Sequence, residues 1–373
     1  MRLVRPRDLL VTFEPAASGQ PGMVMLRSTS RGAGARAPAW AVGVLAACGE
    51  PRSRQELVEA MGPSAGQAFD GLRDAGLLVP VEDAAETPVI FANYAGVDIH
   101  RAMLNDEVRL QAYWEGLKAT VRPGDVVIDA GSGTGILATM AALCGARKVY
   151  AIERTDFAQV IPQVAADSGV ASRVEVVRAD LGRVELPEKA RVMVTETFGH
   201  LAFAEGMMED VLACADRNMT PDRVLVPGAF TLWAAPMRVA PPDLLGAFVR
   251  RPDGVDLRCL LGDARGRAHD RIVRPEEVGS PIALGRVDMP CETAWEGELL
   301  LTEPCEALCT WFTLHMAPGV DMKSGPWDPP THWQQTLLPV ALPAGRHAVS
   351  ISRAPEDGRT IVVDIAGHEV RSR

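Results

Sequence analysis

Residues 126–136 have the sequence VVIDAGSGTGI, in which an apolar run passes into a glycine-rich turn and ends on an aliphatic residue. Glycines at positions 131, 133 and 135 let the backbone approach a ligand closely and adopt conformations that a β-carbon forbids. In a nucleotide-binding sheet, a turn of this kind lies at the carboxyl end of its strand. The stretch therefore predicts a strand, a ligand-binding turn and a helix that follows from Ile136.

The sequence on both sides of this turn alternates between strand-like and helix-like segments, from about Phe91 to Pro227. The strand candidates are Val126–Asp129, Lys148–Glu153, Arg173–Asp180, Arg191–Thr195 and Arg223–Val226. Such alternation is typical of a doubly wound, Rossmann-like sheet of parallel strands. We therefore expect an α/β domain over residues 89–227. Residues 228–373 are rich in short apolar runs, proline and glycine, and predict a mostly β, barrel-like domain with one helix near Asp243–Arg250.

The first 88 residues predict a separate, winged-helix-like α+β module. Ser53 and Glu56 have the spacing of a capping box at the start of a helix, and Gly76 suits the position after the end of another. The expected elements are strands Leu9–Thr12 and Val24–Arg27, helices Ala39–Cys48, Ser53–Met61 and Ser64–Gly76, and a strand Leu77–Val79.

Length, net charge and the lengths of the apolar runs limit the classes of protein to which this chain can belong. A length of 373 residues suits two or three domains. The net charge is −10 and no basic patch is visible, so we expect no nucleic-acid partner, whereas an acidic surface favours a cationic one. No apolar run approaches the roughly 18–20 residues that span a bilayer, and Met1–Leu10 lacks the apolar core of a signal peptide. We therefore expect no membrane association.

Seven cysteines are scattered along the chain without a CxxC pair, at positions 48, 144, 214, 259, 291, 305 and 309. An odd number without paired spacing argues against a disulfide framework and against a zinc site, and we expect no bound metal. Buried, reduced thiols in a cytoplasmic protein are the simpler interpretation.

An acidic residue ends the second expected strand of the α/β domain. Glu153 lies 22 positions after Gly131, close to the spacing of about 20 residues at which an acid hydrogen-bonds a ribose diol. Asp129 precedes the turn, where its charge disfavours a phosphate and suits the cationic amino group of a methionine moiety. The glycine spacing is GxGxG, whereas dinucleotide sites have GxGxxG. These features favour S-adenosylmethionine over a nicotinamide or flavin dinucleotide, and over a tight turn without a ligand.

Further segments, in the same order along the chain, resemble motifs of the protein arginine N-methyltransferase family. FANY at 91–94 is similar to its aromatic N-terminal helix motif, and residues 100–109 resemble its HxxMLxDExR stretch. Residues 195–207, TETFGHLAFAEGM, look like its double-glutamate loop, and THW at 331–333 looks like its THW loop. The resemblance implies a class I methyltransferase with S-adenosylmethionine as cofactor. It also implies a homodimer, with a dimerisation arm between Pro236 and Arg267.

The resemblance assigns roles to individual residues. Glu196 and Glu205 would hold the guanidinium of the acceptor, next to Met207 and Trp333 as substrate-binding residues. His332 would pair with Asp106 behind the glutamates, either to accept the released proton or as a structural support. The cofactor would be bound by Tyr94, His100, Met103, Arg109, Asp129, Gly131, Ser132, Gly133, Thr134, Gly135, Glu153, Asp180 and Leu181.

A pair of carboxylates suits a guanidine acceptor chemically. A guanidinium spreads its charge over its nitrogens, has a pKa above 12 and is a poor nucleophile. Two carboxylates can orient it through charge-assisted hydrogen bonds and draw positive charge away from the attacking nitrogen. That nitrogen then attacks the methyl carbon of the sulfonium, the bond from that carbon to sulfur breaks and the neutral thioether leaves; holding both reactants close supplies much of the rate. The sequence therefore predicts an arginine N-methyltransferase that acts on a peptide or protein arginine, or on free L-arginine.

Three features depart from the family pattern. Thr197 and Phe198 stand where the family has Trp and Met, and His200 stands in place of a Tyr. The family's adenine-contacting glutamate falls on Gly182, which leaves Asp180 or Leu181 to serve the base. These changes keep open another guanidine or amine of specialised metabolism as the acceptor. A cofactor-binding regulator without turnover is a further alternative, although both glutamates are present.

The N-terminal module resembles the small PqqD-like domains that recognise leader peptides. The similar segments are GMVMLRSTS at 22–30, VGVLAACGEPRSRQELVEAMG at 42–62 and LRDAGLLVP at 72–80. Such a domain would bind a peptide by adding a strand to the edge of its sheet. A dimerisation or packing module is the alternative, and a DNA-reading winged helix would need a basic helix that is absent from the sequence.

Overall fold

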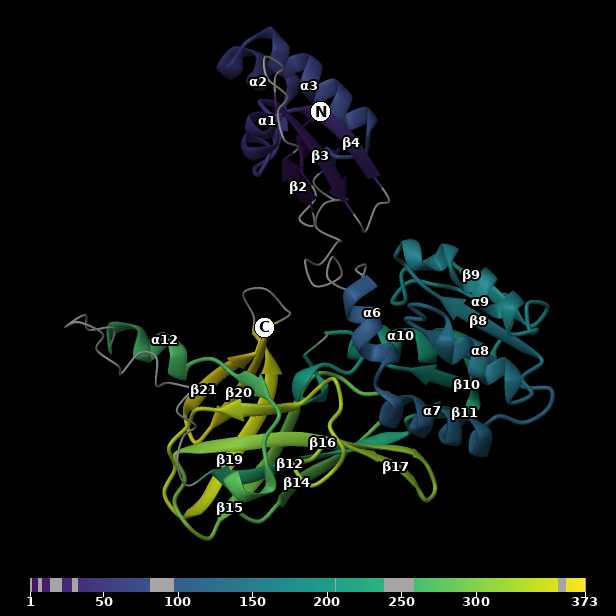
Figure 1. The fold of residues 1–373 in the computed structure, drawn as a ribbon, viewed down its shortest axis with the longest axis vertical. Coiled ribbons are helices and arrows are strands. Elements are labelled where there is room, and N and C mark those ends of the chain that lie inside the picture. The colour runs from purple at the N-terminus through teal and green to yellow at the C-terminus, as the bar shows by residue number, and fades with distance from the viewer. Residues whose placement is uncertain are drawn as a thin grey trace. The chain divides into compact units, whose positions relative to one another are not determined.

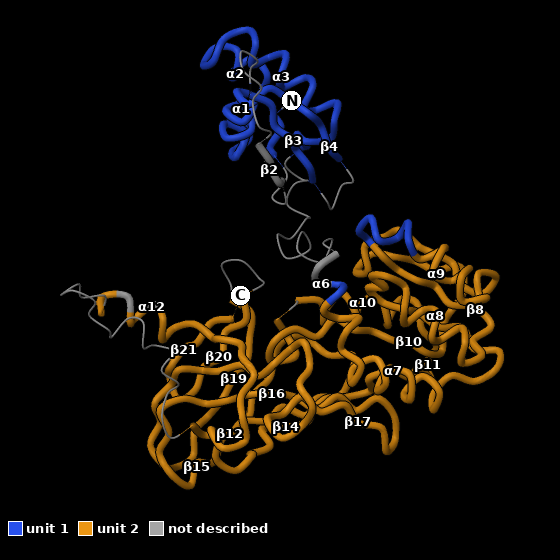
Figure 2. Tube along the Cα trace, in the orientation of Figure 1, with its two compact units in different colours: residues 1–101, 154–160 blue, residues 102–153, 161–373 orange. Residues whose placement is uncertain are grey.

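The computed structural model describes residues 2–5, 9–13, 22–28, 33–80, 97–204, 206–237, 258–354 and 360–372. The chain divides into two compact units, one of residues 1–101 and 154–160 and one of residues 102–153 and 161–373 (Figure 2). Each unit has a hydrophobic core of its own. Among the described residues, no helix has both the length and the apolar character needed to cross a bilayer.

The first unit is a small α+β module. Its strands form two antiparallel sheets in the orders β5-β1-β6 and β2-β3-β4: β1 (Arg2–Val4), β2 (Leu9–Phe13), β3 (Met23–Ser28), β4 (Ala33–Pro38), β5 (Arg52–Ser53) and β6 (Val79–Pro80). Its helices are α1 (Ala41–Ala47), α2 (Arg54–Met61), α3 (Pro63–Asp74) and the short 3₁₀ helix η1 (Asp156–Gln159). The helix α6 (Val97–Leu104) spans the boundary between the units.

The capping box predicted at the start of α2 is present. Ser53 Oγ accepts from the N–H of Glu56 at 3.3 Å, and Glu56 Oε2 accepts from the N–H of Ser53 at 2.7 Å. Strands β1 and β4 were not predicted from the sequence. The β4 sequence AGARAP is poor in β-branched and aromatic residues and has a low strand propensity. Its pairing with β3 therefore keeps it in the sheet.

The second unit contains the parallel sheet predicted from the sequence (Figure 1). Its order is β11-β10-β7-β8-β9, and all neighbours are parallel: β7 (Val126–Ala130), β8 (Lys148–Ile152), β9 (Val174–Val177), β10 (Ala190–Thr195) and β11 (Met219–Val226). Its helices are α7 (Glu107–Thr120), α8 (Ile136–Leu143), α9 (Ile161–Asp167) and α10 (Met208–Asn218), with a 3₁₀ turn η2 (His200–Ala202). The order of the strands reverses between β7 and β10, the position where open α/β sheets bind ligands.

The remaining strands of the second unit form two antiparallel sheets. The larger, in the order β13-β18-β16-β12-β14 with β17 beside β16, contains β12 (Ala229–Met237), β13 (His269–Arg271), β14 (Ile282–Asp288), β16 (Ala307–Ala317), β17 (Val320–Lys323) and β18 (Gln335–Leu338). The smaller, in the order β15-β19-β20-β21, contains β15 (Trp295–Leu301), β19 (Gly345–Arg353), β20 (Ile361–Ile365) and β21 (His368–Ser372). Short helical turns are η4 (Arg258–Leu260), α12 (Leu261–Arg265) and η5 (Pro275–Glu277).

The expectation of a barrel needs correction, because the described strands of this region form two separate sheets rather than one closed ladder. The connection between β14 and β15 contains Pro290, which has no N–H to contribute to a ladder. Arg267, which precedes β13, forms an isolated parallel bridge with Arg371 of β21. The helix expected near Asp243–Arg250 lies outside the described residues.

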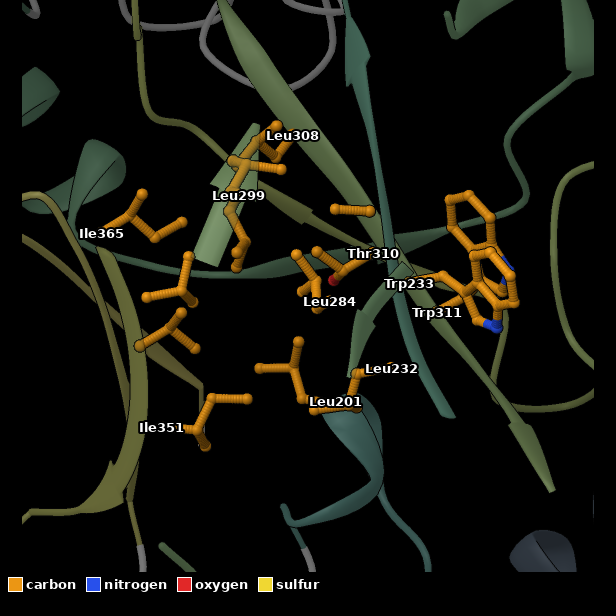
Figure 3. Close-up of a pocket in the computed structure, with 14 residues that line it drawn as sticks. Leu201, Leu232, Trp233, Leu284, Leu299, Leu308, Thr310, Trp311, Ile351 and Ile365 are labelled. Atoms are coloured by element: carbon orange, nitrogen blue, oxygen red, sulfur yellow. The ribbon is translucent and has the colours of Figure 1, made fainter. Parts of the chain in front are cut away.

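The two antiparallel sheets face each other across an apolar space (Figure 3). Leu232 and Leu308 of the larger sheet and Leu299 and Ile351 of the smaller sheet line it, together with Leu201 from η2. The lining contains no charged side chain, so this space does not suit a polar cofactor. The charged groups instead gather at the carboxyl ends of the parallel strands.

Helix α7 packs closely against the larger antiparallel sheet. A β-carbon at Gly116 would lie 2.7 Å from Cβ of Met316 in β16, so only glycine permits this approach. The contact fixes α7, and the side chains that it carries, relative to the strands on either side of it.

Candidate active site

The glycine turn follows β7 and has a backbone geometry that glycine allows. Gly131, Gly133 and Gly135 have φ angles of +78°, +52° and +80°, all in the left-handed region. A β-carbon at Gly135 would lie 2.7 Å from Cγ2 of Ile161, so packing also requires glycine there. The N–H of Gly131 donates to the carbonyl of Ile152 at 3.1 Å, which ties the turn to β8.

Two buried acids converge on this turn. Asp129 accepts from the N–H of Ala138 at 2.8 Å through Oδ2, whereas its Oδ1 has no hydrogen-bond partner among the described residues. Burial raises the pKa of Asp129 to about 7, and the negative charges of Glu153 and Glu196 act in the same direction. Glu153 lies directly after β8, and its Oε2 accepts from the N–H of Gly133 at 2.7 Å. The turn is therefore bordered by two carboxylates, those of Asp129 and Glu153.

The other residues predicted around the turn differ in burial. Ser132 is buried and donates from Oγ to the carbonyl of Asp129 at 3.0 Å, while Thr134 is half-buried. Asp180, beyond the end of β9, accepts through Oδ1 from the N–H of Gly182 at 3.0 Å. The side chain of Leu181 is 6% exposed and belongs to the hydrophobic core.

Glu196 follows β10 directly and lies against Arg109 of α7. The two side chains form an ion pair through Arg109 Nη1 and Glu196 Oε2, with only 4% and 8% of their surfaces exposed. Arg109 Nη2 donates to the carbonyl of Met103 at 2.8 Å. Within the described part of the chain, Glu196 Oε1 and Arg109 Nε are buried without a hydrogen-bond partner. Burial raises the pKa of Glu196, and the positive charge of Arg109 opposes that rise.

Asp106 and His332 meet behind this ion pair. Asp106 caps the start of α7, and its Oδ1 accepts from the N–H of Arg109 at 2.9 Å. Its Oδ2 accepts from the backbone N–H and from Nδ1 of His332, each at 2.9 Å. Burial alone would raise the pKa of Asp106, but the hydrogen bonds from His332 and Arg109 hold it below its usual value. The loop before β18 is thereby fixed to the helix that carries Arg109.

The predicted substrate residues Met207 and Trp333 have different surroundings. Met207 precedes α10, and its Cε would lie 3.9 Å from a β-carbon at Gly131, so it lies beside the cofactor turn. Trp333 is 3% exposed, and its indole N–H donates to the carbonyl of Phe198. Its ring packs against Phe312 with the centroids 5.3 Å apart. Trp333 therefore supports the loop after Glu196 through this hydrogen bond.

For three of the predicted residues, the described part of the second unit gives no position in this group. Tyr94 and Glu205 lie outside the described residues. His100 belongs to the first unit, where its ring lies 3.9 Å from that of Phe157. The residue after Glu205 is described: Gly206 has a φ of +67°.

The departures from the family pattern have structural counterparts. Thr197 is buried, and its Cγ2 would lie 3.3 Å from a β-carbon at Gly131, so this small side chain packs on the glycine turn. Phe198 is fully buried in the core. Nδ1 of His200 lies 3.0 Å from Oδ1 of Asp270 in β13.

The sequence interpretation missed two residues close to the site. Tyr113 donates from its hydroxyl to the carbonyl of Thr195 at 2.9 Å and so fixes the end of β10 just before Glu196. Its position four residues after Arg109 on the same helix was a usable signal, because such residues share a helix face. Asp210 of α10 is the other: its Oδ1 would lie 2.4 Å from a β-carbon at Gly182, and no local pattern indicated this approach.

The comparison with protein families matches part of the chain. The model described as ribosomal protein L11 methyltransferase (PrmA) matches residues 111–196, which contain the glycine turn and end on Glu196. Among curated proteins, protein arginine N-methyltransferase 6 of Danio rerio is 29% identical over 281 residues, covering 69% of this chain and 80% of that protein. Protein arginine N-methyltransferase PRMT10 of Oryza sativa subsp. japonica is 38% identical over 150 residues, which cover 40% of each chain.

Solved structures share the fold. The Trypanosoma brucei PRMT1 enzyme-prozyme heterotetrameric complex with AdoHcy aligns with a TM-score of 0.68 at 23% identity, covering 75% of this chain and 99% of that chain. Arabidopsis thaliana protein arginine methyltransferase 10 aligns with a TM-score of 0.60 at 23% identity, covering 75% and 97%. The parallel sheet and the antiparallel region that follows it are thus an arrangement already seen in solved structures.

Proposed function

We propose that this chain, a homologue of the protein arginine N-methyltransferases, transfers a methyl group from S-adenosylmethionine to a guanidino nitrogen of arginine. The observation that supports this proposal most directly is the environment of the two carboxylate oxygens of Glu196. One of its oxygens is ion-paired with Arg109, and the other is buried beside the cofactor turn without a partner among the described residues. A buried carboxylate oxygen without a hydrogen-bond partner costs free energy, and a cationic donor such as a guanidinium would remove that cost.

The residues at the turn fit S-adenosylmethionine. Asp129 Oδ1 and Arg109 Nε, both buried and without partners in the described chain, suit the amino and carboxylate groups of the methionine end. Glu153 suits the ribose hydroxyls, since it lies after β8 and borders the turn. When bound, the cofactor supplies a methyl group activated by a positively charged sulfur. Within this proposal Met103, Gly131–Gly135, Asp180 and Leu181 complete the pocket, and Tyr94 and His100 remain predicted cofactor residues.

The side chains of the chain itself orient the acceptor. Glu196 Oε1 accepts from one guanidinium nitrogen, and Glu205 accepts from another, so that the positive charge is drawn towards the carboxylates. The remaining nitrogen is then held towards the methyl donor. Holding both groups near attack distance lowers the entropic part of the barrier.

Within this proposal, His332 accepts the proton released on transfer. Asp106 as a carboxylate can only accept, so Nδ1 of His332 carries the hydrogen between them and Nε2 of the neutral ring is an acceptor. The depressed pKa of Asp106 keeps this carboxylate ionised, which stabilises the ring after it gains a proton.

The acceptor is arginine in a peptide or protein, and the N-terminal module contributes to its recognition. The sheet β2-β3-β4 of the first unit has β2 and β4 at its edges within the described residues. A peptide added as a further strand to such an edge is bound through its backbone. This proposal treats residues 1–88 as a peptide-recognition module, residues 89–227 as the cofactor domain and residues 228–373 as a substrate and dimerisation domain of a homodimer.

We also propose that the protein works in the cytoplasm, which is a reducing compartment. Burial raises the pKa of the thiols of Cys48 and Cys214 to about 11 and of Cys309 to about 12, so these thiols stay protonated and unreactive.

Labelled methyl transfer tests the function. The full-length protein is incubated with labelled S-adenosylmethionine and either arginine peptides or free L-arginine, and the product is identified by mass spectrometry. We expect label on a guanidino nitrogen of the peptide, and none when Glu196→Gln replaces the wild type. Label on free arginine alone would move the acceptor to the small molecule, and label on neither would reject the proposed activity.

A further inference from the structure

The last residue of β10 is Thr195, and its side chain reaches the neighbouring parallel strand β7. Thr195 Oγ1 donates to the carbonyl of Ala130, the last residue of β7, at 3.2 Å. The same two residues are register partners in the ladder between the strands. The hydroxyl therefore ties the two strands together at the point where both of them end.

A second hydroxyl joins this contact. Thr197 Oγ1 lies 3.1 Å from Thr195 Oγ1. Thr195 has one hydroxyl hydrogen, which it donates to Ala130, so Thr197 is the donor in this pair. Both threonines are at most 2% exposed, so these hydrogen bonds are shielded from bulk water.

The carbonyl of Thr195 is held as well, by helix α7. The hydroxyl of Tyr113, which is fully buried, donates to it at 2.9 Å. A backbone carbonyl belongs to the planar peptide unit that joins its residue to the next one. The hydrogen bond from Tyr113 therefore orients the peptide plane that leads into Glu196. In the same way, the hydroxyl of Thr195 orients the plane that leads from Ala130 into Gly131, the first glycine of the cofactor turn.

Glu196 is thus held at its backbone and at its carboxylate by one helix. Arg109 lies four residues before Tyr113 on α7 and forms the ion pair with Oε2 of Glu196. Thr195 links this hold to the cofactor turn, because its carbonyl is bonded to α7 and its hydroxyl to the strand that carries the turn.

We propose that Thr195 is a positioning residue for the methyl-transfer reaction, which keeps Glu196 and the glycine turn at Gly131 at a fixed separation. The inference rests on the proposed function, in which Glu196 holds the acceptor and the turn borders the methyl donor. The side chain of Thr195 is fully buried and bonded to Ala130 and Thr197, so it acts through its neighbours rather than by contact with a reactant.

The test compares four full-length variants with the wild type. Thr195→Val keeps the shape of the side chain but lacks the hydroxyl, and Thr195→Ser keeps the hydroxyl. Tyr113→Phe removes the hydrogen bond to the carbonyl of Thr195. Thr310→Val is the matched control, since Thr310 is a buried threonine of β16 whose hydroxyl also donates to a carbonyl of a neighbouring strand, that of Thr336 in β18, at 2.9 Å.

Each protein is assayed in three ways. Thermal unfolding gives Tm, and calorimetry gives the affinity for S-adenosylhomocysteine. Kinetics with an arginine peptide give KM and the rate of methyl transfer in a single turnover, with enzyme and S-adenosylmethionine in excess over the peptide.

We expect the single-turnover rate to fall about 10- to 100-fold in Thr195→Val, because displacement of an orienting group by about 1 Å costs rates of this order. Cofactor affinity and KM should stay within about threefold of wild type, since the charged groups that bind the ligands remain present. Thr195→Ser should recover most of the rate, and Tyr113→Phe should lose about tenfold. Thr310→Val should lower Tm about as much as Thr195→Val and leave the rate unchanged, which separates positioning from stability.

A wild-type rate in Thr195→Val, an equally slow Thr195→Ser, or an equal loss of rate in Thr310→Val would overturn the positioning role. If Thr195→Val shows no folding transition, Tyr113→Phe decides the question, and an unchanged rate in that variant then counts against the proposal. An inactive wild type on every guanidine would reject the proposed function and this role together, whereas an active wild type with unaffected variants would reject the role alone.

Discussion

The parallel sheet and the antiparallel sheets of the second unit contribute to the site in different ways. Three neighbouring parallel strands each supply one acid near their carboxyl ends: Asp129 in β7, Glu153 after β8 and Glu196 after β10. The antiparallel region supplies groups that hold others in position, such as His332 against Asp106 and Arg353 against Gly206. A parallel sheet gathers its strand ends at one edge, so it concentrates functional groups.

Because of this difference, substitutions in the two regions should have different effects. A change at one of the three acids removes a group that touches substrate or cofactor, so its effect is large and specific to one ligand. A change in the supporting region shifts groups that remain present, so its effect is smaller and is seen in turnover more than in binding.

The largest effect is expected for Glu196→Gln. The amide keeps the size and one acceptor oxygen but removes the charge that pairs with the guanidinium, so kcat/KM should fall by about 100- to 1,000-fold. Labelled methyl transfer to an arginine peptide measures it, and Glu205→Gln should behave alike. Calorimetry should show cofactor affinity nearly intact in both variants. An equal loss of cofactor affinity in both would break the distinction between the acceptor acids and the cofactor acids.

A change at Asp129 should affect the cofactor instead. Asp129→Asn removes the carboxylate proposed for the cationic amino group, and we expect cofactor affinity to fall about 10- to 100-fold by calorimetry. Asp129→Glu is the control, because it keeps the carboxylate charge but lengthens the side chain by one methylene group. Unaltered affinity in Asp129→Asn would remove Asp129 from the cofactor site.

The same variant makes a prediction about stability and pH. The pKa of Asp129 is raised to about 7 in the folded chain, above its value near 4 when unfolded, so the folded state loses stability as the pH rises from about 4 through 7. Asn carries no charge and escapes this loss. Without ligand, Asp129→Asn should therefore melt roughly 5 °C higher than wild type at pH 8, and the gap should shrink as the pH is lowered towards 4. A gap that is independent of pH would contradict the raised pKa.

An intermediate effect is expected where the two regions meet. Asp106→Asn weakens the contact that fixes the ring of His332, and kcat should fall about tenfold while cofactor affinity changes little. The measurement is the pH profile of kcat in the variant and in wild type. If His332 accepts the proton, the acidic limb of the profile should move in Asp106→Asn, whereas a purely supporting pair would lower kcat at every pH alike.

The smallest effect, on turnover of a small acceptor, is expected for a change outside the three sheets of the second unit. Removal of residues 1–85 should leave methylation of a small guanidine within about twofold of wild type and raise KM for a leader-bearing peptide about tenfold, through loss of strand addition. Kinetics with the two acceptors measure this. Equal KM values for the peptide in both proteins would discard the recognition role of the N-terminal module, and a packing or dimerisation role would replace it.

Local sequence signals were sufficient for the parallel sheet. Each of the five predicted strands occurs, and the glycine turn lies where the motif placed it, because periodicity and the φ requirements of glycine act over a few residues. The capping box of α2 is local in the same sense. The number of antiparallel sheets was not predictable in this way, since pairing between β19 and β20 or between β12 and β16 depends on segments far apart in the chain.

The sequence by itself determined which residue types were available: acids at three strand ends, a histidine in the THW segment, and glycines where the backbone turns. Only the tertiary structure decided which of them meet. It joined Arg109 to Glu196 across 87 residues, and it connected Arg353 to Gly206 across 147. The physical reason is range, because backbone conformation is set by neighbours a few positions away, whereas the partner of a buried charge is set by the packing of whole sheets and helices.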